Sequence, residues 1–153
     1  MNTLFKIVIA ITICLLVGFF SRHFQTEALT NWYPSLKKPP LTPSNILFPI
    51  AWSLIYITMG ISIALVISDT TSHPIVISLF IIQLLVNFLW SLGFFYLKSP
   101  LLGFIDIIIL IMLIISYMIV TWPIHIWSSL LFVPYLLWVL FASYLNGYIL
   151  INN

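Results

Sequence analysis

The chain alternates long apolar runs with a few isolated charges. Residues 39–68, 70–97 and 107–153 contain no Asp, Glu, Lys or Arg. A helix crosses the hydrocarbon core of a bilayer with about 20 mostly apolar residues. Trp122-Pro123 divides the last run, because proline lacks an amide hydrogen and disfavours helix in the residue before it. The pattern therefore predicts five membrane-spanning helices, over about 4–22, 45–67, 74–97, 101–121 and 124–150.

Composition agrees with this pattern. Hydrophobic residues make up 63% of the chain and charged residues 5%, against about 45–50% and about 25% in soluble domains. The runs are continuous, whereas a membrane β-barrel would show alternating segments of about 10 residues. We expect an all-α membrane protein, with residues 1–153 forming a single five-transmembrane-helix bundle. The first run follows a lysine, as a secretory signal does, but it offers no small-x-small cleavage site and is interpreted as the first span.

The few basic residues predict an orientation. Arg22, Lys37, Lys38 and Lys98 fall in the connections after the first and third spans, and only Lys6 falls on the other side. The positive-inside rule then places the first loop and the C-terminus in the cytoplasm. Because no targeting extension precedes the first span, a bacterial plasma membrane is expected rather than an organelle.

Residues 23–44 form the one long connection, and their composition is unusual. They contain Trp32-Tyr33 and four prolines. Long loops without regular structure are commonly functional lids or linkers, and prolines lower the entropy of the free segment. This favours a lid, with an interfacial aromatic belt as the alternative. Residues 68–74 and 98–100 are expected to be simple turns.

Several spans carry aromatic and polar stripes at helical spacing, which puts their members on one face. The second and fourth spans begin at the cytoplasmic side, and the third and fifth end there. The position of each stripe along its span therefore places the stripes, together with Asp106, in the cytoplasmic half of the bundle. Facing one another, they would line an aromatic pocket below the long loop, rimmed by the basic residues. Core packing and interhelical hydrogen bonds are the alternative interpretation. The stripes comprise Trp52 and Tyr56 on the second span, Gln83, Asn87, Trp90 and Phe94 on the third, and Tyr135, Trp138, Ala142, Leu145 or Asn146, and Ile149 on the fifth.

Such a pocket would suit a large, flat, conjugated guest, because indole and phenol rings favour offset stacking and edge contacts. A tetrapyrrole fits, and its carboxylates suit a basic rim; a sterol fits less completely. No cofactor or metal is predicted, because Cys14 is the only cysteine and His23, His73 and His125 lie too far apart to share an ion. We find no Ser/His/Asp set, no phosphate-binding glycine loop and no paired carboxylates, so acid–base hydrolysis is not expected.

The pattern from about Arg22 to Asn146 resembles the translocator protein family, also called tryptophan-rich sensory proteins or peripheral benzodiazepine receptors. The resemblance rests on Trp32-Tyr33-x-x-Leu36-x-Lys38-Pro39, Pro43, Pro49-x-x-Trp52-x-x-Ile55-Tyr56-x-x-Met59-Gly60, Asn87-x-x-Trp90-x-x-x-Phe94-Phe95, Asp106, and Pro134-Tyr135-x-x-Trp138-x-x-Phe141-Ala142-x-x-Leu145-Asn146. It implies a five-helix bundle, often dimeric, that binds porphyrins and isoquinoline or benzodiazepine-type drugs beneath the first loop. Light- and oxygen-dependent porphyrin breakdown is associated with bacterial members, with tryptophans at the positions of Trp52 and Trp138.

The resemblance also implies a set of ligand-binding residues. It maps the family's pocket onto Ser21, Trp32, Pro39, Pro43, Phe48, Trp52, Asn87, Trp90, Ile105, Ile109, Trp138, Ala142 and Leu145. Two features depart from the family pattern. No Lys or Arg follows Tyr148, so sterol binding is not expected. The small-xxx-small dimer face falls at Ser78 and Ile82, where isoleucine prevents the closest helix approach.

The leading interpretation is a tetrapyrrole-binding sensor or scavenger in a bilayer, expected to form a homodimer and to have no nucleic-acid partner. A transporter of porphyrin or another hydrophobic solute is the second interpretation, with Asp106 as the only buried acid that could couple transport to protons. A regulatory interaction protein with an incidental pocket is the third. Alanine at both Trp52 and Trp138 would leave that third role intact.

Overall fold

The structure, a computed structural model, describes residues 2–69 and 73–153, and within these ranges it contains helices and no strand. Five segments are long and apolar enough to cross a membrane, which confirms the predicted fold class. The turn expected over 68–74 falls partly outside the described residues. The elements are α1 (Thr3–His23), α2 (Thr26–Asn31), the short 3-10 helix η1 (Tyr33–Ser35), α3 (Leu47–Ser68), α4 (Pro74–Trp90), its π-helical continuation η2 (Ser91–Tyr96), α5 (Pro100–Thr121), α6 (Ile126–Leu130) and α7 (Val133–Asn152).

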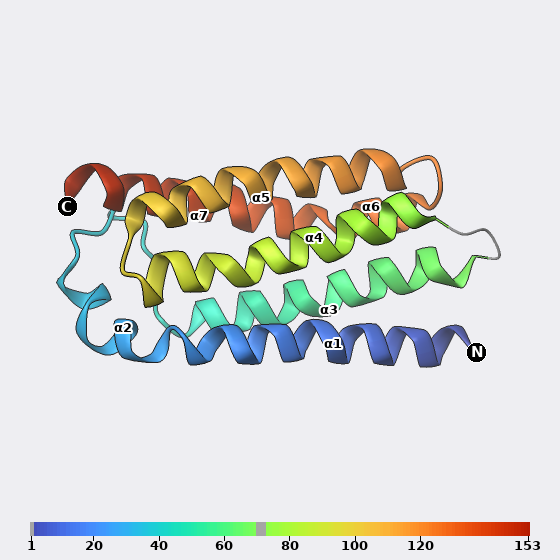
Figure 1. The fold of residues 1–153 in the computed structure, drawn as a ribbon, viewed down its shortest axis with the longest axis horizontal. Helices are drawn as coiled ribbons and strands as arrows, with labels where there is room; N and C mark the ends of the chain where they lie inside the picture. The colour runs from blue at the N-terminus through green and yellow to red at the C-terminus, as the bar shows by residue number, and fades with distance from the viewer. Residues whose placement is uncertain (1, 70–72) are drawn as a thin grey trace.

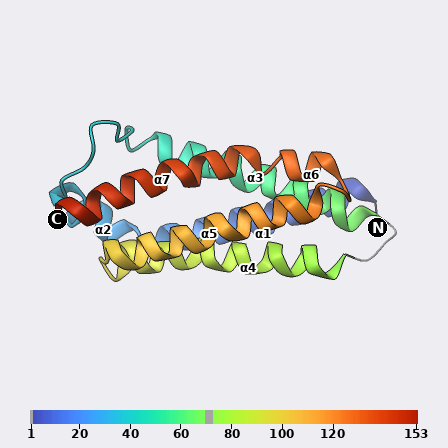
Figure 2. The same ribbon diagram turned by 90° about the horizontal axis from the view of Figure 1, so that it is seen from above.

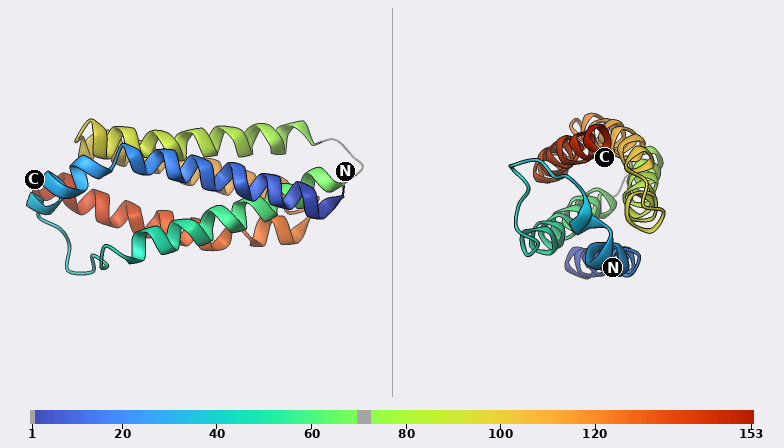
Figure 3. Two further views of the ribbon diagram at one scale, coloured as in Figure 1. Left: turned by 90° about the horizontal axis from the view of Figure 1, so that it is seen from below. Right: turned by 90° about the vertical axis from the view of Figure 1, so that its left-hand side faces the viewer.

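The long helices run side by side along the bundle axis. Seen from its end, the bundle has the order α1, α3, α7, α5, α4 around a ring (Figure 3, right). The N-terminus lies at one end, and α2 and the C-terminus lie at the other (Figure 1). An odd number of spans requires this separation. Figure 2 shows the first loop passing from α2, beside the end of α7, to the start of α3.

Proline and capping residues set several helix starts. Pro74, Pro100 and Pro134 each stand in the first turn of a helix, where the missing amide hydrogen has no cost. Ser99 caps α5, its hydroxyl oxygen accepting from the Leu102 amide at 3.3 Å. Lys98 before it adopts a left-handed backbone with φ of 50°, which turns the chain sharply from η2 into α5.

Two sequence-based boundaries need correction. The fifth span, predicted as one helix over 124–150, is interrupted after Leu130 and resumes at Val133. Pro134 explains the break, because its ring and missing amide hydrogen do not fit a helix interior. The first loop, expected to lack regular structure, contains α2 and η1, and Trp32 donates its amide hydrogen to the Ala28 carbonyl at 3.0 Å.

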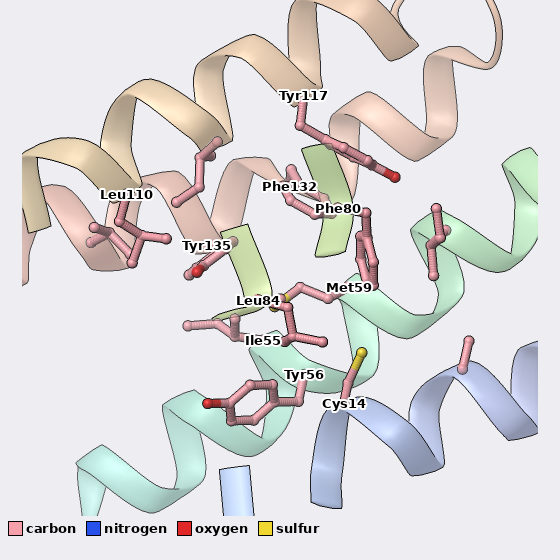
Figure 4. Packing of buried hydrophobic residues seen from close by; sticks show 14 of the residues in the cluster. Cys14, Ile55, Tyr56, Met59, Phe80, Leu84, Leu110, Tyr117, Phe132 and Tyr135 are labelled. Carbon is pink, nitrogen blue, oxygen red and sulfur yellow. The ribbon is translucent and has the colours of Figure 1, made fainter. Parts of the chain in front are cut away.

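The end of the bundle that holds the N-terminus has a solid core (Figure 4). Tyr117 stacks on Phe132 with ring centroids 4.1 Å apart, and both side chains are fully buried with Met59. The Ser62 hydroxyl donates to the Ser128 carbonyl at 2.7 Å, joining α3 to α6. Close packing here fixes the helices, so that the hollow part of the bundle lies at its other end.

Candidate ligand-binding cavity

A cavity of about 470 Å³ lies in the half of the bundle next to the first loop. Its walls come from α1, α3, α4, η2 and α7. The first loop, residues 24–46, covers the cavity with α2 and η1, and we call this segment the cap. Small-molecule sites typically occupy about 300–1,000 Å³ and combine apolar walls with a few polar groups. The cavity fits that description in size and in lining.

Trp52 on α3 is the centre of the aromatic wall. Its ring lies 5.8 Å from Tyr56 in a stacked arrangement, 6.3 Å from Trp90 and 6.2 Å from Tyr135. Trp90 stacks in turn on Phe94, with centroids 5.6 Å apart and the planes 5° from parallel. These distances are typical of favourable aromatic pairs. The wall therefore presents several ring surfaces held rigidly by one another.

A hydrogen-bonded bridge lies beside this wall and joins three helices. The Tyr56 hydroxyl donates to Asn87 Oδ1 at 2.7 Å, and Asn87 Nδ2 donates to the Tyr135 hydroxyl at 3.0 Å. All three side chains are buried, and buried polar groups are costly unless paired. Asn87 therefore joins α3, α4 and α7 by hydrogen bonds and also lines the cavity. Tyr135 does not line the cavity and lies in the core behind the aromatic wall.

A second amide fixes the indole of Trp90. Trp90 Nε1 donates to Asn146 Oδ1 at 3.3 Å, and Asn146 Nδ2 donates to the Pro100 carbonyl at 3.1 Å. Gly103 makes room for this contact, because a Cβ there would lie 3.0 Å from Asn146 Oδ1 and 2.8 Å from the Phe94 Cβ. The orientation of Trp90 is therefore set by α7 and by the start of α5.

Trp138 supplies the part of the cavity wall on α7. It lies on α7, half-buried, and its ring is 5.9 Å from Phe48 at the start of α3. Ala142, one turn further along, also lines the cavity and is too small to fill it. Trp52 and Trp138 therefore both line the space, from different helices.

Two polar side chains from α1 reach the cavity. Ser21 is buried beside Tyr56, and its hydroxyl makes no hydrogen bond of ordinary geometry within the described residues. Arg22 is exposed and lines the cavity, and none of the ion pairs between described residues involves it. On the α1 side of the cavity, a ligand would therefore meet one hydroxyl, from Ser21, and one cation, from Arg22.

The rim of four basic residues needs correction. Only Arg22 lines the cavity. Lys98 is paired with Glu27 at 3.1 Å. Lys38 donates to the Tyr33 carbonyl at 2.9 Å and lies 4.8 Å from the centre of the Tyr33 ring. These lysines hold the cap and do not face the cavity.

The cap is attached to the bundle by side chains. Tyr33 is buried against Phe95, with ring centroids 5.8 Å apart, and this burial raises the pKa of the Tyr33 hydroxyl. The hydrogen bond from Lys98 holds the pKa of Glu27 below its ordinary value. Asn153 completes the attachment, since its side chain accepts from the Lys37 amide at 2.9 Å and donates to the Lys37 carbonyl at 3.2 Å.

Of the thirteen ligand-binding residues that the resemblance predicts, eight line the cavity and five do not. Trp32 packs on Phe94 at 5.4 Å, and Pro39 and Pro43 lie in the loop. Ile105 and Ile109 are 48% and 41% exposed on α5, on its outer side. The residues in the wall are Ser21, Phe48, Trp52, Asn87, Trp90, Trp138, Ala142 and Leu145.

Asp106, expected in the pocket, does not line it. Its Oδ2 is buried without a hydrogen-bond partner among the described residues. The reason is geometric, because the cavity wall contains no residue of α5. A carboxylate is therefore not among the groups a ligand would meet. Within residues 2–69 and 73–153, no three His, Cys, Asp or Glu side chains are placed to hold a metal ion.

Sequence reasoning missed the contribution of α1 beyond Ser21 and Arg22. Leu15, Gly18 and Phe19 also line the cavity. The helix is apolar on all sides, so no stripe marked its inner face. The spacing of Gly18 and Ser21, two small residues three positions apart, was the one available signal.

Comparison with known proteins agrees with this architecture. The pattern of the TspO/MBR family matches residues 10–151. The tryptophan-rich protein TspO of Chlorobaculum tepidum is 40% identical over 148 residues, covering 95% of this chain and 94% of the relative. The protein of the same name from Archaeoglobus fulgidus is 40% identical over 154 residues, covering 100% and 99%.

A third relative is protein CrtK of Rhodobacter capsulatus, 37% identical over 118 residues, which covers 75% of this chain and 74% of the relative. The two TspO proteins match essentially from end to end, through all five spans and the first loop. With the family pattern extending across the same region, the chain belongs to the TspO/MBR family of integral membrane proteins.

Proposed function

We propose that this protein is a membrane receptor for porphyrins, such as protoporphyrin IX and related haem-pathway tetrapyrroles. The observation that carries the proposal is the cavity itself, which Trp52, Trp90 and Trp138 line from three helices and Arg22 borders at its edge. Indole faces suit a flat conjugated ring. Isoquinoline and benzodiazepine-type drugs, which are also flat and aromatic, would occupy the same space.

The polar groups define how a tetrapyrrole would be oriented. Its ring would lie among the indoles, and one propionate would reach the Arg22 guanidinium, which offers paired donors to a carboxylate. Ser21 would supply a hydroxyl to a ring or side-chain heteroatom. The amides of Asn87 and Asn146 are already bonded to protein groups, so their role is to hold the walls.

A titration with two ligands tests the proposal. Protoporphyrin IX carries two carboxylates, whereas its dimethyl ester has the same ring without charge. The wild-type protein in nanodiscs should quench its tryptophan emission with both and bind the acid about two- to fivefold tighter, as expected for an exposed ion pair. Arg22→Gln should abolish this preference, whereas Lys37→Gln, a loop cation outside the cavity wall, should keep it. Absence of saturable binding by the wild-type protein would refute the proposal.

Light-dependent breakdown of the bound porphyrin is part of the same proposal. A photoexcited tetrapyrrole held against an indole can take an electron from it and pass that electron to dioxygen, which leaves an indole radical cation and superoxide beside the pigment. The radical cation and superoxide can then each take one electron from the ring; this restores the indole, converts superoxide and two protons from the ring to hydrogen peroxide, and leaves the tetrapyrrole oxidised by two electrons. Trp52 and Trp138 would be the indole partners. Both line the cavity, Trp52 from α3 and Trp138 from the neighbouring helix α7, which supports this assignment.

We also propose a cellular setting for the receptor. We place it in a bacterial plasma membrane with the first loop and the C-terminus in the cytoplasm, in keeping with the positive-inside rule, and as a homodimer. Cysteine labelling of Lys37→Cys in intact cells would test the orientation, because a cytoplasmic residue is protected from a membrane-impermeant reagent. Cross-linking in native membranes would test the dimer.

A further inference from the structure

The cavity opens sideways between α1 and α3. Leu15 and Phe19 on α1, and Pro49 and Ser53 on α3, line the cavity and are also exposed on the outer surface. Phe19 is 70% exposed. All four residues belong to segments able to cross a membrane. We call this opening the α1/α3 mouth; in a bilayer it faces lipid.

The packing of the two helices explains why a mouth forms there. At Gly60, an added Cβ would lie 2.6 Å from the Cα of Ile11, so the backbones of α1 and α3 touch directly. At Gly18, nearer the cavity, the nearest group of α3 is the ring of Tyr56. The helices are therefore separated by a side chain at that level. Figure 3 (left) shows α1 and α3 meeting near the N-terminus and diverging towards α2.

The end of the cavity that faces water is closed by specific contacts. Ala28 and Tyr33 of the cap are buried. Three contacts from separate points of the first loop tie it to the bundle: the Gln25 side chain donates to the Ser91 hydroxyl at 2.8 Å, Glu27 pairs with Lys98 at 3.1 Å, and the Lys37 backbone amide donates to the Asn153 side chain at 2.9 Å. The four residues that border the α1/α3 mouth are exposed, and the hydroxyl of the one polar member, Ser53, donates within its own helix to the Pro49 carbonyl at 2.7 Å. The lateral side is thus the less obstructed one.

We propose that the ligand reaches the cavity sideways from the lipid phase, through the α1/α3 mouth, while the cap stays in place. This inference rests on the proposed function and adds the class of ligand: a planar, lipid-soluble acid. Phe19 and Arg22 stand three positions apart on the same face of α1. The apolar body would pass Phe19 within the hydrocarbon region, and its acidic group would remain at Arg22 near the water boundary.

Narrowing the mouth provides the first arm of the test. Ser53→Phe adds a ring at the edge of the mouth, and Leu54→Phe adds one at the next residue, which is 60% exposed and lies outside the cavity wall. Protoporphyrin IX is delivered from phosphatidylcholine vesicles to the full-length protein in nanodiscs, and association and dissociation are followed by stopped-flow fluorescence. Ser53→Phe should slow both association and dissociation at least about fivefold; a loss of affinity alone would not slow dissociation, so a fall in both rates identifies an effect on access. Leu54→Phe should match the wild type.

Widening the mouth provides the second arm. Phe19→Ala removes the ring that borders the opening, whereas Phe20→Ala removes a neighbouring exposed ring outside the wall. Phe19→Ala should speed both rates, and Phe20→Ala should leave them unchanged. Asn153→Ala removes the hydrogen bonds between Asn153 and the Lys37 backbone of the cap. This variant should also leave both rates unchanged.

The outcomes separate this inference from the function on which it rests. If Ser53→Phe and Phe19→Ala exchange porphyrin at wild-type rates while Asn153→Ala speeds exchange, access is from water past the cap and the inference is wrong, although the receptor proposal stands. If the wild-type protein binds no porphyrin, both are wrong. Rates that respond at the mouth and not at the cap support lateral access.

Discussion

The hydroxyl of Tyr56 donates to Asn87 Oδ1 at 2.7 Å, which links α3 to α4 directly beside the cavity. Because Asn87 also donates to the Tyr135 hydroxyl at 3.0 Å, one amide satisfies two buried phenols from different helices. The aromatic wall is thus anchored by polar contacts that lie behind it.

Replacing this amide tests its structural role. Asn87→Leu keeps the size of the side chain but leaves the hydroxyls of Tyr56 and Tyr135 without their partner. An unpaired buried polar group costs about 1–3 kcal/mol, so the thermal unfolding midpoint in detergent should fall. Tyr56→Phe removes one hydroxyl and leaves one buried acceptor, Asn87 Oδ1, without its donor, so it should cost less than the loss of both bonds. Equal midpoints for Asn87→Leu and the wild type would contradict the bridge.

The close approach of α1 and α3 predicts a second difference in stability. Gly60→Ala would bring a methyl group within 2.6 Å of the Ile11 backbone, which cannot move as a side-chain tip can. Overpacking of this kind typically costs about 1–3 kcal/mol. Gly93→Ala is the matched control, because its Cβ would meet its nearest neighbour, the Leu102 Cβ, at 3.4 Å. Thermal unfolding of the two variants should separate them, and similar midpoints would show that the helices are not in direct contact.

The Glu27–Lys98 pair makes attachment of the cap depend on pH. Since the folded pKa of Glu27 is depressed below its ordinary value of 4.5, the pair contributes above that value and is lost as pH falls through the folded pKa. Limited proteolysis of residues 24–44 should therefore accelerate below about pH 4.5 in the wild type, and high salt should weaken the protection, because exposed pairs are screened.

Glu27→Gln is the control for this pH dependence. It should raise cleavage modestly at neutral pH and remove the acid-dependent step, because the amide cannot titrate. A wild-type cleavage rate that follows the rate of Glu27→Gln at every pH would show that the pair does not hold the cap.

The roles proposed for Trp52 and Trp138 predict a photochemical difference. Trp138→Phe and Trp52→Phe should each slow bleaching of bound protoporphyrin under light and air, because phenylalanine is much harder to oxidise than an indole, while binding changes little. Trp127→Phe is the control, since Trp127 is 65% exposed on α6, away from the cavity. The measurement is the loss of porphyrin absorbance under light, with enough protein present to bind all of the porphyrin. Wild-type rates in both cavity variants would remove these residues from the photochemistry.

Much of the fold could be predicted because the bilayer imposes strict lengths. The charge-free runs and the prolines at 74, 100 and 123 mark the five spans to within a few residues of the helices observed. The break before Pro134 was missed because the flanking residues are as apolar as the span itself. The helix of the cap was missed because Thr26–Asn31 has few residues and lies within a segment whose prolines suggested a loop.

The site was predictable where helical stripes combine aromatic and amide residues. Spacing and depth predict that Trp52, Asn87, Trp90 and Trp138 face a common space, and all four line the cavity. The inner face of α1 carried no such contrast. The outward positions of Ile105 and Ile109 were also not predictable, because the rotation of an almost uniformly apolar helix depends on its neighbours and not on its own periodicity.

Filling the cavity is the most direct test of whether it is the porphyrin site. Ala142→Phe places a ring inside the cavity, whereas Leu140→Phe places one on the exposed side of the same helix, where Leu140 is 44% exposed. With both variants folded by circular dichroism, equilibrium titration with protoporphyrin IX should show binding weakened at least about tenfold, or roughly 1.4 kcal/mol, in Ala142→Phe and unchanged in Leu140→Phe. Wild-type affinity in Ala142→Phe would place the ligand elsewhere on the protein.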